Sequence, residues 1–175
     1  MEAIVAVYAD WGIGCGGTQP VVVKADRKHF RAVTGSAAVI VGRKTLADFP
    51  GGRPLPGRHN IVLTRSLAEI PGAEIARTPA QAAEAARAHG RCFVIGGASV
   101  YRQTFPWLDR VYVTQIDACP ESDSFFPDLD ADPDWVVTED GPWQEEDGVR
   151  YRFRTYQRRP APEKDAAPEA PGVSD

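Results

Sequence analysis

Short apolar runs that each end in glycine and lead into a helical stretch are the feature that most restricts how this chain can fold. Ala37–Val41 leads into Gly42 and a helix that starts near Arg43, and Cys92–Ile95 leads into a pair of glycines. A continuously apolar strand is typical of a parallel sheet covered on both faces, and strands that alternate with helices indicate βαβ connections. The pattern therefore predicts an α/β fold with a mostly parallel central sheet and flanking helices.

The other expected elements follow from the same reading of the sequence. Trp135–Glu139 and Arg150–Gln157 alternate polar and apolar residues, which predicts an antiparallel hairpin, joined by an acidic loop, at the C-terminal edge of the sheet. We expect further strands at Ala3–Tyr8, Asn60–Thr64, Glu74–Ala76 and Arg110–Ile116, and helices at Lys24–Thr34, Ala80–His89 and Ser99–Phe105.

The last residues differ from the rest in composition. Pro160–Asp175 contains no aromatic residue and a single valine among prolines, alanines and acidic residues. Such a segment buries too little apolar area to offset the entropy lost on ordering. We therefore expect one folded domain over residues 1–159 and a disordered tail over residues 160–175.

Charge and composition narrow the classes of function. The net charge of −4 argues against a dedicated nucleic-acid binder. No apolar run reaches the length of a membrane span, and no basic segment precedes an apolar one at the start, as a signal peptide requires. The three cysteines and three histidines show no metal-ligand spacing, so zinc and a disulfide framework are not expected. We expect a cytoplasmic monomer without a membrane, nucleic-acid or metal partner.

The helix expected over Lys24–Thr34 carries a carboxylate on its apolar side. Asp26 shares one stripe of that helix with Phe30 and Val33. A carboxylate in this position is costly unless it is paired, bound to a ligand or partly protonated, and desolvation raises its pKa toward the range that suits acid chemistry. Asp26 is thus a candidate acid or a ligand for a cationic heterocycle. The alternative is that it only complements the helix dipole.

Strand ends elsewhere in the sequence carry features of an anion site. Residues 42–45, Gly-Arg-Lys-Thr, place two cations at the start of a helix, where they oppose the dipole unless an anion binds. Arg65 follows the next strand, and Gly96-Gly97 again joins a strand to a helix. Together they indicate a dinucleotide across the strand ends, with solvated cations and a tight turn as the alternatives. Arg58 is a candidate clamp for a carboxylate or a solvated loop arginine.

In their order and spacing, these motifs resemble the dihydrofolate reductase family over nearly all of the expected domain, from about Ala3 to Arg158. Each motif alone is weak, and their shared order makes the set specific. The segments that carry the resemblance are Trp11-Gly12-Ile13-Gly14, Ala25-Asp26 followed by Phe30, Val41–Thr45, Gly52–Leu63, Val94–Gly97 with Val100-Tyr101, and Thr114–Asp117 with Phe126-Pro127-Asp128.

The resemblance implies an NADPH-dependent oxidoreductase that reduces dihydrofolate to tetrahydrofolate, by hydride transfer to C6 and protonation at N5. It implies that Asp26 is the one catalytic carboxylate, that Thr114 joins it at the pterin, and that Arg58 binds the α-carboxylate of the glutamate. Antifolates would then be inhibitors. The substrate-binding residues that it implies are Ile4, Val5, Asp26, Phe30, Phe49, Leu55, Arg58 and Thr114.

For the cofactor, the resemblance implies NADPH, with Arg43, Thr64 and Arg65 around the adenosine 2′-phosphate. The segment Asp10–Val22 would be a mobile lid over the site, and its four glycines suit a moving loop. The other cofactor-binding residues that it implies are Ala6, Ile13, Gly14, Gly42, Lys44, Thr45, Leu63, Ile95, Gly96, Gly97, Ala98, Ser99, Val100 and Tyr101.

The lid departs from the family at three positions. Val21 stands where many members have a tryptophan that holds a water near the acid, Gln19 where they have Met or Leu, and Lys24 where they have Pro. These changes bear on proton delivery, on the closed form of the lid and on antifolate binding.

Two other functions compete with dihydrofolate reduction. One is the related pyrimidine reductase of riboflavin synthesis, which shares the fold and the cofactor face. The pocket residue Asp26 and the clamp residue Arg58 favour folate over this alternative. The other is a non-catalytic folate- and NADPH-binding module, which only the departures at Gln19 and Val21 support.

Overall fold

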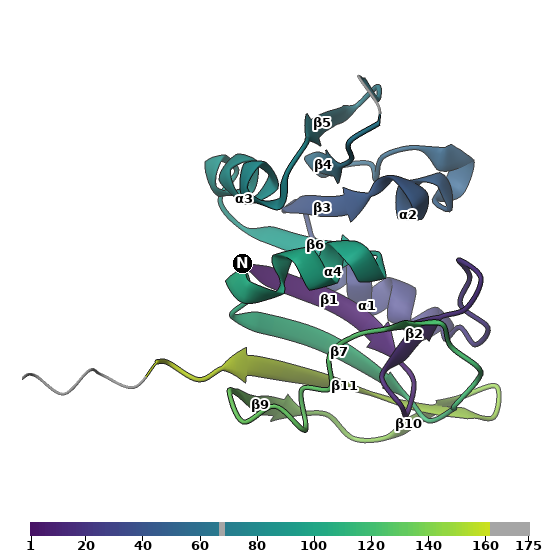
Figure 1. The fold of residues 1–175 in the computed structure, drawn as a ribbon. Coiled ribbons are helices and arrows are strands. Elements are labelled where there is room, and N and C mark those ends of the chain that lie inside the picture. The colour runs from purple at the N-terminus through teal and green to yellow at the C-terminus, as the bar shows by residue number, and fades with distance from the viewer. Residues whose placement is uncertain (67–68, 162–175) are drawn as a thin grey trace, which may run out of the picture.

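One large sheet organises the chain (Figure 1). The structure, a computed structural model, describes residues 1–66 and 69–161. The sheet has nine strands, in the order β10-β11-β7-β1-β6-β3-β4-β5, with β9 also paired to β11. The strands are β1 (Glu2–Val7), β3 (Ala38–Gly42), β4 (Asn60–Leu63), β5 (Ala73–Ala76), β6 (Cys92–Gly96), β7 (Arg110–Ile116), β9 (Trp135–Asp140), β10 (Gln144–Glu146) and β11 (Val149–Arg158).

The strands from β7 to β5 are parallel, and β11 runs antiparallel to β7, β9 and β10. The predicted α/β class, its parallel centre and its antiparallel edge are therefore confirmed. The helices are α1 (Lys24–Thr34), α2 (Arg43–Ala47), α3 (Pro79–Ala88) and α4 (Ala98–Thr104), with single 3-10 turns at Pro50–Gly52 and Phe105–Trp107. Among the described residues, no helix has both the length and the hydropathy to cross a membrane.

The predicted C-terminal hairpin is more elaborate than expected. Its connecting segment contains β10, which pairs with the first residues of β11, whereas β9 pairs with the later ones. The turn between β10 and β11 is Asp147-Gly148, with φ of 50° and 80°. Two positive φ angles are typical of the tight hairpin turn that Asp-Gly favours, so the dipeptide was a signal for the extra strand. The tail predicted over residues 160–175 lies almost wholly outside the described residues.

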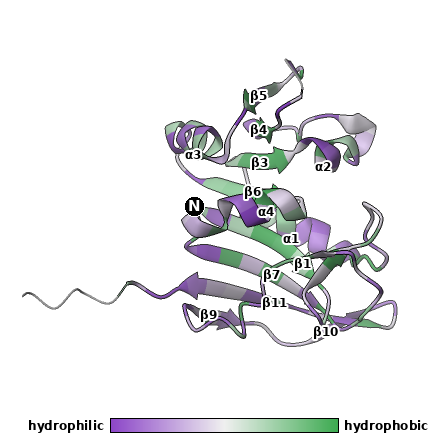
Figure 2. Ribbon diagram, viewed as in Figure 1, coloured by the Kyte–Doolittle hydropathy of each residue, from purple (hydrophilic) through white to green (hydrophobic). Residues whose placement is uncertain are grey.

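Successive side chains of the central strands pack on opposite faces of the sheet. Ala3, Val5 and Val7 of β1 join the apolar cluster that also holds Ala86 of α3 and Tyr101 of α4. Ala6, which lies between Val5 and Val7 on β1, packs instead with the apolar cluster on the other face of the sheet, on the side of α1. Figure 2 shows the apolar residues concentrated along β1 and β3, in the middle of the sheet, with more polar residues along β11.

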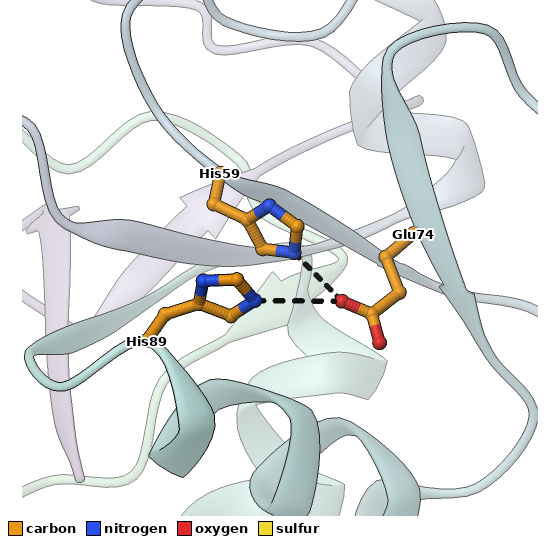
Figure 3. A group of neighbouring side chains, drawn as sticks. All are labelled: His59, Glu74 and His89. Carbon is orange, nitrogen blue, oxygen red and sulfur yellow. Dashed lines mark hydrogen bonds and ion pairs between the residues drawn. The ribbon is translucent and has the colours of Figure 1, made fainter.

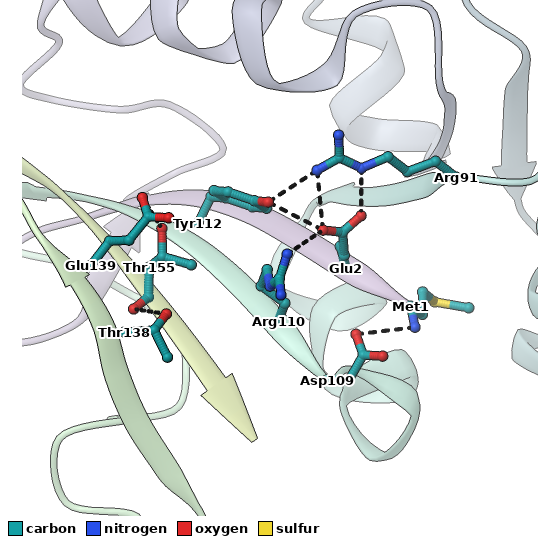
Figure 4. Close-up of polar contacts among 9 residues, drawn as sticks. All are labelled: Met1, Glu2, Arg91, Asp109, Arg110, Tyr112, Thr138, Glu139 and Thr155. Atoms are coloured by element: carbon teal, nitrogen blue, oxygen red, sulfur yellow. Dashed lines mark hydrogen bonds and ion pairs between the residues drawn. The ribbon is translucent and has the colours of Figure 1, made fainter. Parts of the chain in front are cut away.

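A polar network ties the N-terminal ends of three parallel strands together (Figure 4). Glu2 of β1 accepts hydrogen bonds from Arg91, at 2.8 and 3.2 Å, and from the Tyr112 hydroxyl, at 3.2 Å. Arg110 lies 3.9 Å from the same carboxylate. Charged groups thus link the N-terminal ends of these strands. The C-terminal ends of the parallel strands carry the glycines and cations of the predicted site.

Candidate active site

Asp26 is held on the inner side of α1 by a hydrogen bond to the sheet. The Thr114 hydroxyl, in the middle of β7, donates to Asp26 Oδ1 over 2.6 Å. Burial raises the pKa of Asp26 above its usual value, and the bond from Thr114 together with the charges of His29 and Arg27 opposes only part of that shift. The arrangement is that of a carboxyl group which keeps its proton to higher pH than a solvated aspartate.

Strand register decides which residues share the face of Asp26. Ala6 of β1 lies opposite Thr114 of β7, and Ile4 lies opposite Tyr112, so the two β1 residues point toward α1. Val5 lies between them, and its side chain packs in the cluster on the other face. Of the predicted pocket residues on β1, the side chain of Ile4 is therefore on the side of Asp26. Val5 can contact a ligand there only through its backbone.

A carboxylate from the far edge of the sheet caps α1. The N-cap residue, Val23, has no side-chain group that accepts a hydrogen bond from the first N–H groups of the helix. Instead Glu146 of β10 accepts hydrogen bonds from the backbone N–H groups of Lys24 and Ala25, at 2.6 and 3.0 Å. A proline at position 24 has no N–H to donate. Because Lys24 stands where many family members have proline, this chain has an additional N–H group at the start of α1, and Glu146 of the distant strand β10 accepts its hydrogen bond.

Replacing Glu146 with alanine is expected to lower the free energy of unfolding by about 1 kcal/mol, because two N–H groups at the start of α1 lose their acceptor. In a chain of this length that lowers the melting temperature by roughly 2–4 °C. The neighbouring Glu145 is exposed, so Glu145→Ala is the matched control. Thermal melts that show equal effects for the two variants would contradict the capping role.

The inward side of α1 is only partly covered by protein. Thr34 is its one buried residue, whereas Asp26, Phe30 and Val33 stay partly accessible. Phe49 and Leu55 are also half-buried. Half-covered apolar side chains beside a shielded carboxyl group are what a flat heterocycle with polar edges requires.

Arg58 is fixed in place at the far end of α1. Its Nε donates to the Thr34 hydroxyl and its Nη1 to the Pro56 carbonyl, both over 3.1 Å. The guanidinium lies over the ring of Phe30, 5.7 Å from the centroid. Burial, and then the charge of Arg31, lower the pKa of Arg58. Within the part of the chain that the structure describes, neither Arg58 nor Arg31 forms an ion pair with a carboxylate, and two such neighbouring cations favour an anion between them.

Asn60 braces the loop that carries Arg58. Its Oδ1 accepts from the Leu55 N–H over 2.9 Å, and its Nδ2 donates to the carbonyls of Leu55 and Arg58, at 2.9 and 3.0 Å. Asn60 is 1% exposed, so these bonds satisfy a side chain that water does not reach. Sequence reasoning missed this role, although an asparagine at the start of a buried strand was a signal for it.

The glycines of the predicted cofactor site meet at the C-terminal ends of neighbouring strands. Gly42 of β3 lies beside Leu63 of β4, and the residue before it pairs with Gly96 of β6. A Cβ on Gly97 would lie 2.8 Å from Thr45 Oγ1, and one on Gly42 would lie 3.0 Å from Val100. The two glycine motifs are thus in close contact, and a side chain on either glycine would force a neighbouring side chain to move.

Exposed cations surround this end of the sheet. Arg43 and Lys44 begin α2, Arg65 follows β4, and all three are exposed. Arg77, at the end of β5, donates to the carbonyl of Thr64 over 3.4 Å. Sequence reasoning did not single out Arg77, because it follows the weakest of the predicted strands. Within residues 1–66 and 69–161, none of these four cations forms an ion pair with a carboxylate.

Several predicted cofactor residues have side chains turned into the protein. Val100 and Tyr101 of α4 are buried, and the Tyr101 hydroxyl donates to the Ile4 carbonyl over 2.6 Å. Ile95 packs with the cluster around Val41. The hydroxyl of the exposed Ser99 accepts from Gln103 over 2.8 Å. Between Ile95 and Tyr101, it is therefore the backbone around Gly96 that is left at the strand ends for a cofactor. Ala98, the first residue of α4, is half-buried beside it.

The predicted lid is fastened at several points along its length. Its residues Gly12–Gly14 form β2, which pairs with β8 (Ser124–Phe125), and the half-buried Ile13 packs on the core. The Gly16 N–H donates to Asp123 over 2.9 Å. At its other end, the Tyr8 hydroxyl donates to the Val21 carbonyl over 2.8 Å and accepts from the Val21 N–H. Gln19 is exposed.

The fold and the geometry of the candidate site define a class of protein. A parallel sheet with a glycine-lined strand edge and a shielded carboxyl group beside it defines an α/β protein that binds its ligands at the strand ends. The family model described as dihydrofolate reductase matches residues 1–158. The chain belongs to the dihydrofolate reductase family.

Curated relatives are similar in sequence to this chain over most of its length. The dihydrofolate reductase of Bacillus subtilis is 34% identical over 159 residues, which cover 89% of this chain and 93% of that protein. The dihydrofolate reductase of Gallus gallus is 34% identical, with 90% of this chain and 96% of that protein covered. The type A13 dihydrofolate reductase of Escherichia coli is 32% identical, with 89% and 93% covered.

Proposed function

We propose that this protein reduces dihydrofolate to tetrahydrofolate, with NADPH as the hydride donor. The observation that carries the proposal is the Asp26–Thr114 pair on the half-covered side of α1, where burial raises the pKa of the carboxyl group. Membership of the dihydrofolate reductase family supports the same reaction. Neither pyrimidine reductase nor a non-catalytic module finds support among the relatives, which carry the name of the reductase.

Asp26 would bind the pterin and keep its reacting edge within reach of a proton. Thr114 donates to Oδ1, so the other carboxyl oxygen is the one directed to the ring. The raised pKa keeps a share of the group protonated nearer to neutral pH. Reduction needs one proton for each hydride, and a carboxyl group of this kind is suited to general-acid work.

Arg58 and Arg31 would hold the carboxylate end of the substrate. Thr34 and Pro56 already fix the Arg58 guanidinium, so little side-chain entropy is lost when a carboxylate binds. Phe30, beneath that guanidinium, would contact the apolar middle of the substrate. Asp26 and Phe30 follow one another along α1, and Arg58 lies at the end of the helix, where it bonds Thr34. This order fits a long ligand with a polar ring at one end and an acid at the other.

The strand ends fit a phosphorylated dinucleotide. Gly42 and Gly97 leave backbone exposed where side chains would collide, and Thr45 lies between the two motifs. When bound, NADPH supplies the hydride. Arg43, Arg65 and Arg77 would bind the 2′-phosphate that distinguishes NADPH from NADH, because their charges have no protein counter-ion among the described residues. Thr64, between them, would donate its hydroxyl to the same phosphate.

The double variant Arg43→Ala/Arg65→Ala is expected to raise KM for NADPH by roughly a hundredfold or more, since each of the two lost charge-assisted bonds to a phosphate contributes about 1.5–3 kcal/mol. KM for NADH should not change, because NADH has no 2′-phosphate. Steady-state kinetics with both cofactors provide the measurement, and Arg87→Ala, an exposed arginine on α3, is the control. An equal loss with both cofactors would refute the assignment.

A spectrophotometric assay tests the function as a whole. Oxidation of NADPH that depends on dihydrofolate is the expected result, together with inhibition by diaminopyrimidine antifolates. Turnover of a pyrimidine substrate, or tight binding of NADPH and antifolate without turnover, would instead support one of the two alternatives. A folded sample that fails to oxidise NADPH with dihydrofolate would refute the proposal.

The cellular setting is also part of the proposal. Cys15, Cys92 and Cys119 are all free thiols, which favours a reducing compartment such as the cytoplasm. We expect a monomer, and sedimentation or size-exclusion measurements test this.

A further inference from the structure

Two histidines and a glutamate that are far apart in the sequence converge on the surface beside α3 (Figure 3). His59 Nε2 lies 2.7 Å from Glu74 Oε2, and His89 Nε2 lies 3.8 Å from the same oxygen. The two imidazole rings are stacked, with centroids 3.6 Å apart and planes 22° from parallel. Both Nε2 atoms therefore point at one carboxylate oxygen.

The fold assembles this cluster from three separate elements. His59 directly precedes β4, two residues before the buried Ile61, and Ile61 is paired with Glu74 in the β4–β5 register. Side chains two apart on a strand share a face, and Ile61 packs with Ala86 of α3. His59 and Glu74 thus face α3, and His89 stands at the C-terminal end of that helix.

We propose that His59, Glu74 and His89 bind a divalent transition-metal ion of the zinc type. Two imidazole nitrogens and one carboxylate oxygen are ligands that such ions take in proteins, with a fourth position left to water. The three ligand atoms all lie within 4.8 Å of one another. Around a tetrahedral zinc ion, ligand atoms lie about 3.3 Å apart, so small side-chain rotations complete the site.

Access and position agree with an ion site that is separate from the folate and cofactor sites. The three side chains are 37%, 43% and 38% exposed, so an ion reaches them from solvent. Arg58, next to His59 in the chain, turns to the other face and bonds Thr34 of α1. A bound ion would link β4, the edge strand β5 and the end of α3, and would so stabilise the folded state without touching the reacting groups.

Calorimetric titration of the full chain with Zn²⁺ tests the proposal. We expect one ion per chain, and at least about a tenfold weaker affinity in His89→Asn and in Glu74→Gln, because each removes one of three ligands. Glu84→Gln, an exposed glutamate on α3, is the matched control and should bind as the parent does. Zinc at a hundredfold excess over its Kd should raise the melting temperature by roughly 5–10 °C in the parent and the control.

Co²⁺ provides a second readout that reports on the ligands themselves. Its visible absorption should appear with the parent chain and be lost or altered in His89→Asn. Melting temperatures measured without metal show that each variant is folded, and rates of NADPH oxidation should be equal in all of them. If no ion binds, or if zinc binds both ligand variants as tightly as the control, for example through Cys15 or Cys119, the proposal is wrong.

Discussion

Asp26→Asn is expected to lower the rate of dihydrofolate reduction at neutral pH by about 10²–10⁴-fold, the usual contribution of a positioned general acid. Asparagine has the same shape and its side-chain oxygen still accepts the bond from Thr114, so the pocket keeps its form. What is lost is the proton and the charge. In the parent protein the rate should fall as pH rises through the raised pKa of Asp26, and the variant should lack this pH dependence.

Stability separates this chemical role from a structural one. An aspartate whose pKa is raised by burial stabilises the folded state most at low pH, below its pKa in the unfolded chain, and this contribution is lost as pH rises through the folded pKa. Asp26→Asn should therefore melt at the same temperature as the parent or higher at neutral pH. Asp134→Asn, at an exposed position, is the control. An inactive variant that also melts well below the parent would indicate damage to the fold instead.

Arg58→Leu is expected to raise KM for dihydrofolate by roughly thirtyfold or more, because truncating one partner of a shielded charge pair costs about 2–5 kcal/mol. The rate constant kcat should change much less, since the carboxylate is remote from the reacting ring and is bound equally in the ground and transition states. Steady-state kinetics measure both quantities.

A shortened substrate makes the Arg58 test specific. A dihydropterin that lacks the glutamate should be reduced equally well by the parent and by Arg58→Leu, because it has no carboxylate to lose. Arg87→Leu, on α3, which packs on the other face of the sheet, controls for a change in net charge. If the variant loses the shortened substrate as severely as the full one, Arg58 acts on the shape of the pocket and not on the acid.

Much of the fold follows from local patterns. The predicted limits of the first helix, Lys24–Thr34, and of the strand Arg110–Ile116 agree with the structure. The helix has a polar stripe and ends before Gly35, which adopts a φ of 51°. The elements that were missed, β2, β8 and β10, are two or three residues long. Such short strands have no periodicity of their own and exist because a partner strand supplies their hydrogen bonds.

The residues that line the candidate site could be predicted from the sequence, whereas most residues that hold them in place could not. The inward position of Asp26 followed from helical spacing, and the location of both glycine motifs at the C-terminal ends of strands followed from the strand–glycine–helix pattern. The face of the sheet on which Val5 lies could not be predicted, because a strand that is buried on both sides is apolar at every position. Glu146 was also not predicted, since a cap from a distant strand leaves no pattern in the residues next to the helix. The role of Asn60 was not predicted either, although a polar residue at the start of a buried strand was a signal for it.

The sequence by itself determined the parallel sheet, the acidic residue on the inner stripe of α1 and the glycines at the strand ends, because each of these depends on residues within one or two turns or strands. Tertiary structure alone decided that Glu146 caps α1 and that His59 and His89 meet over Glu74. The bond between Thr114 and Asp26 was expected only from the family resemblance, and no local pattern indicated it. Contacts of this kind depend on strand register and on how a helix packs on the sheet, and the spacing of residues along the chain does not encode either.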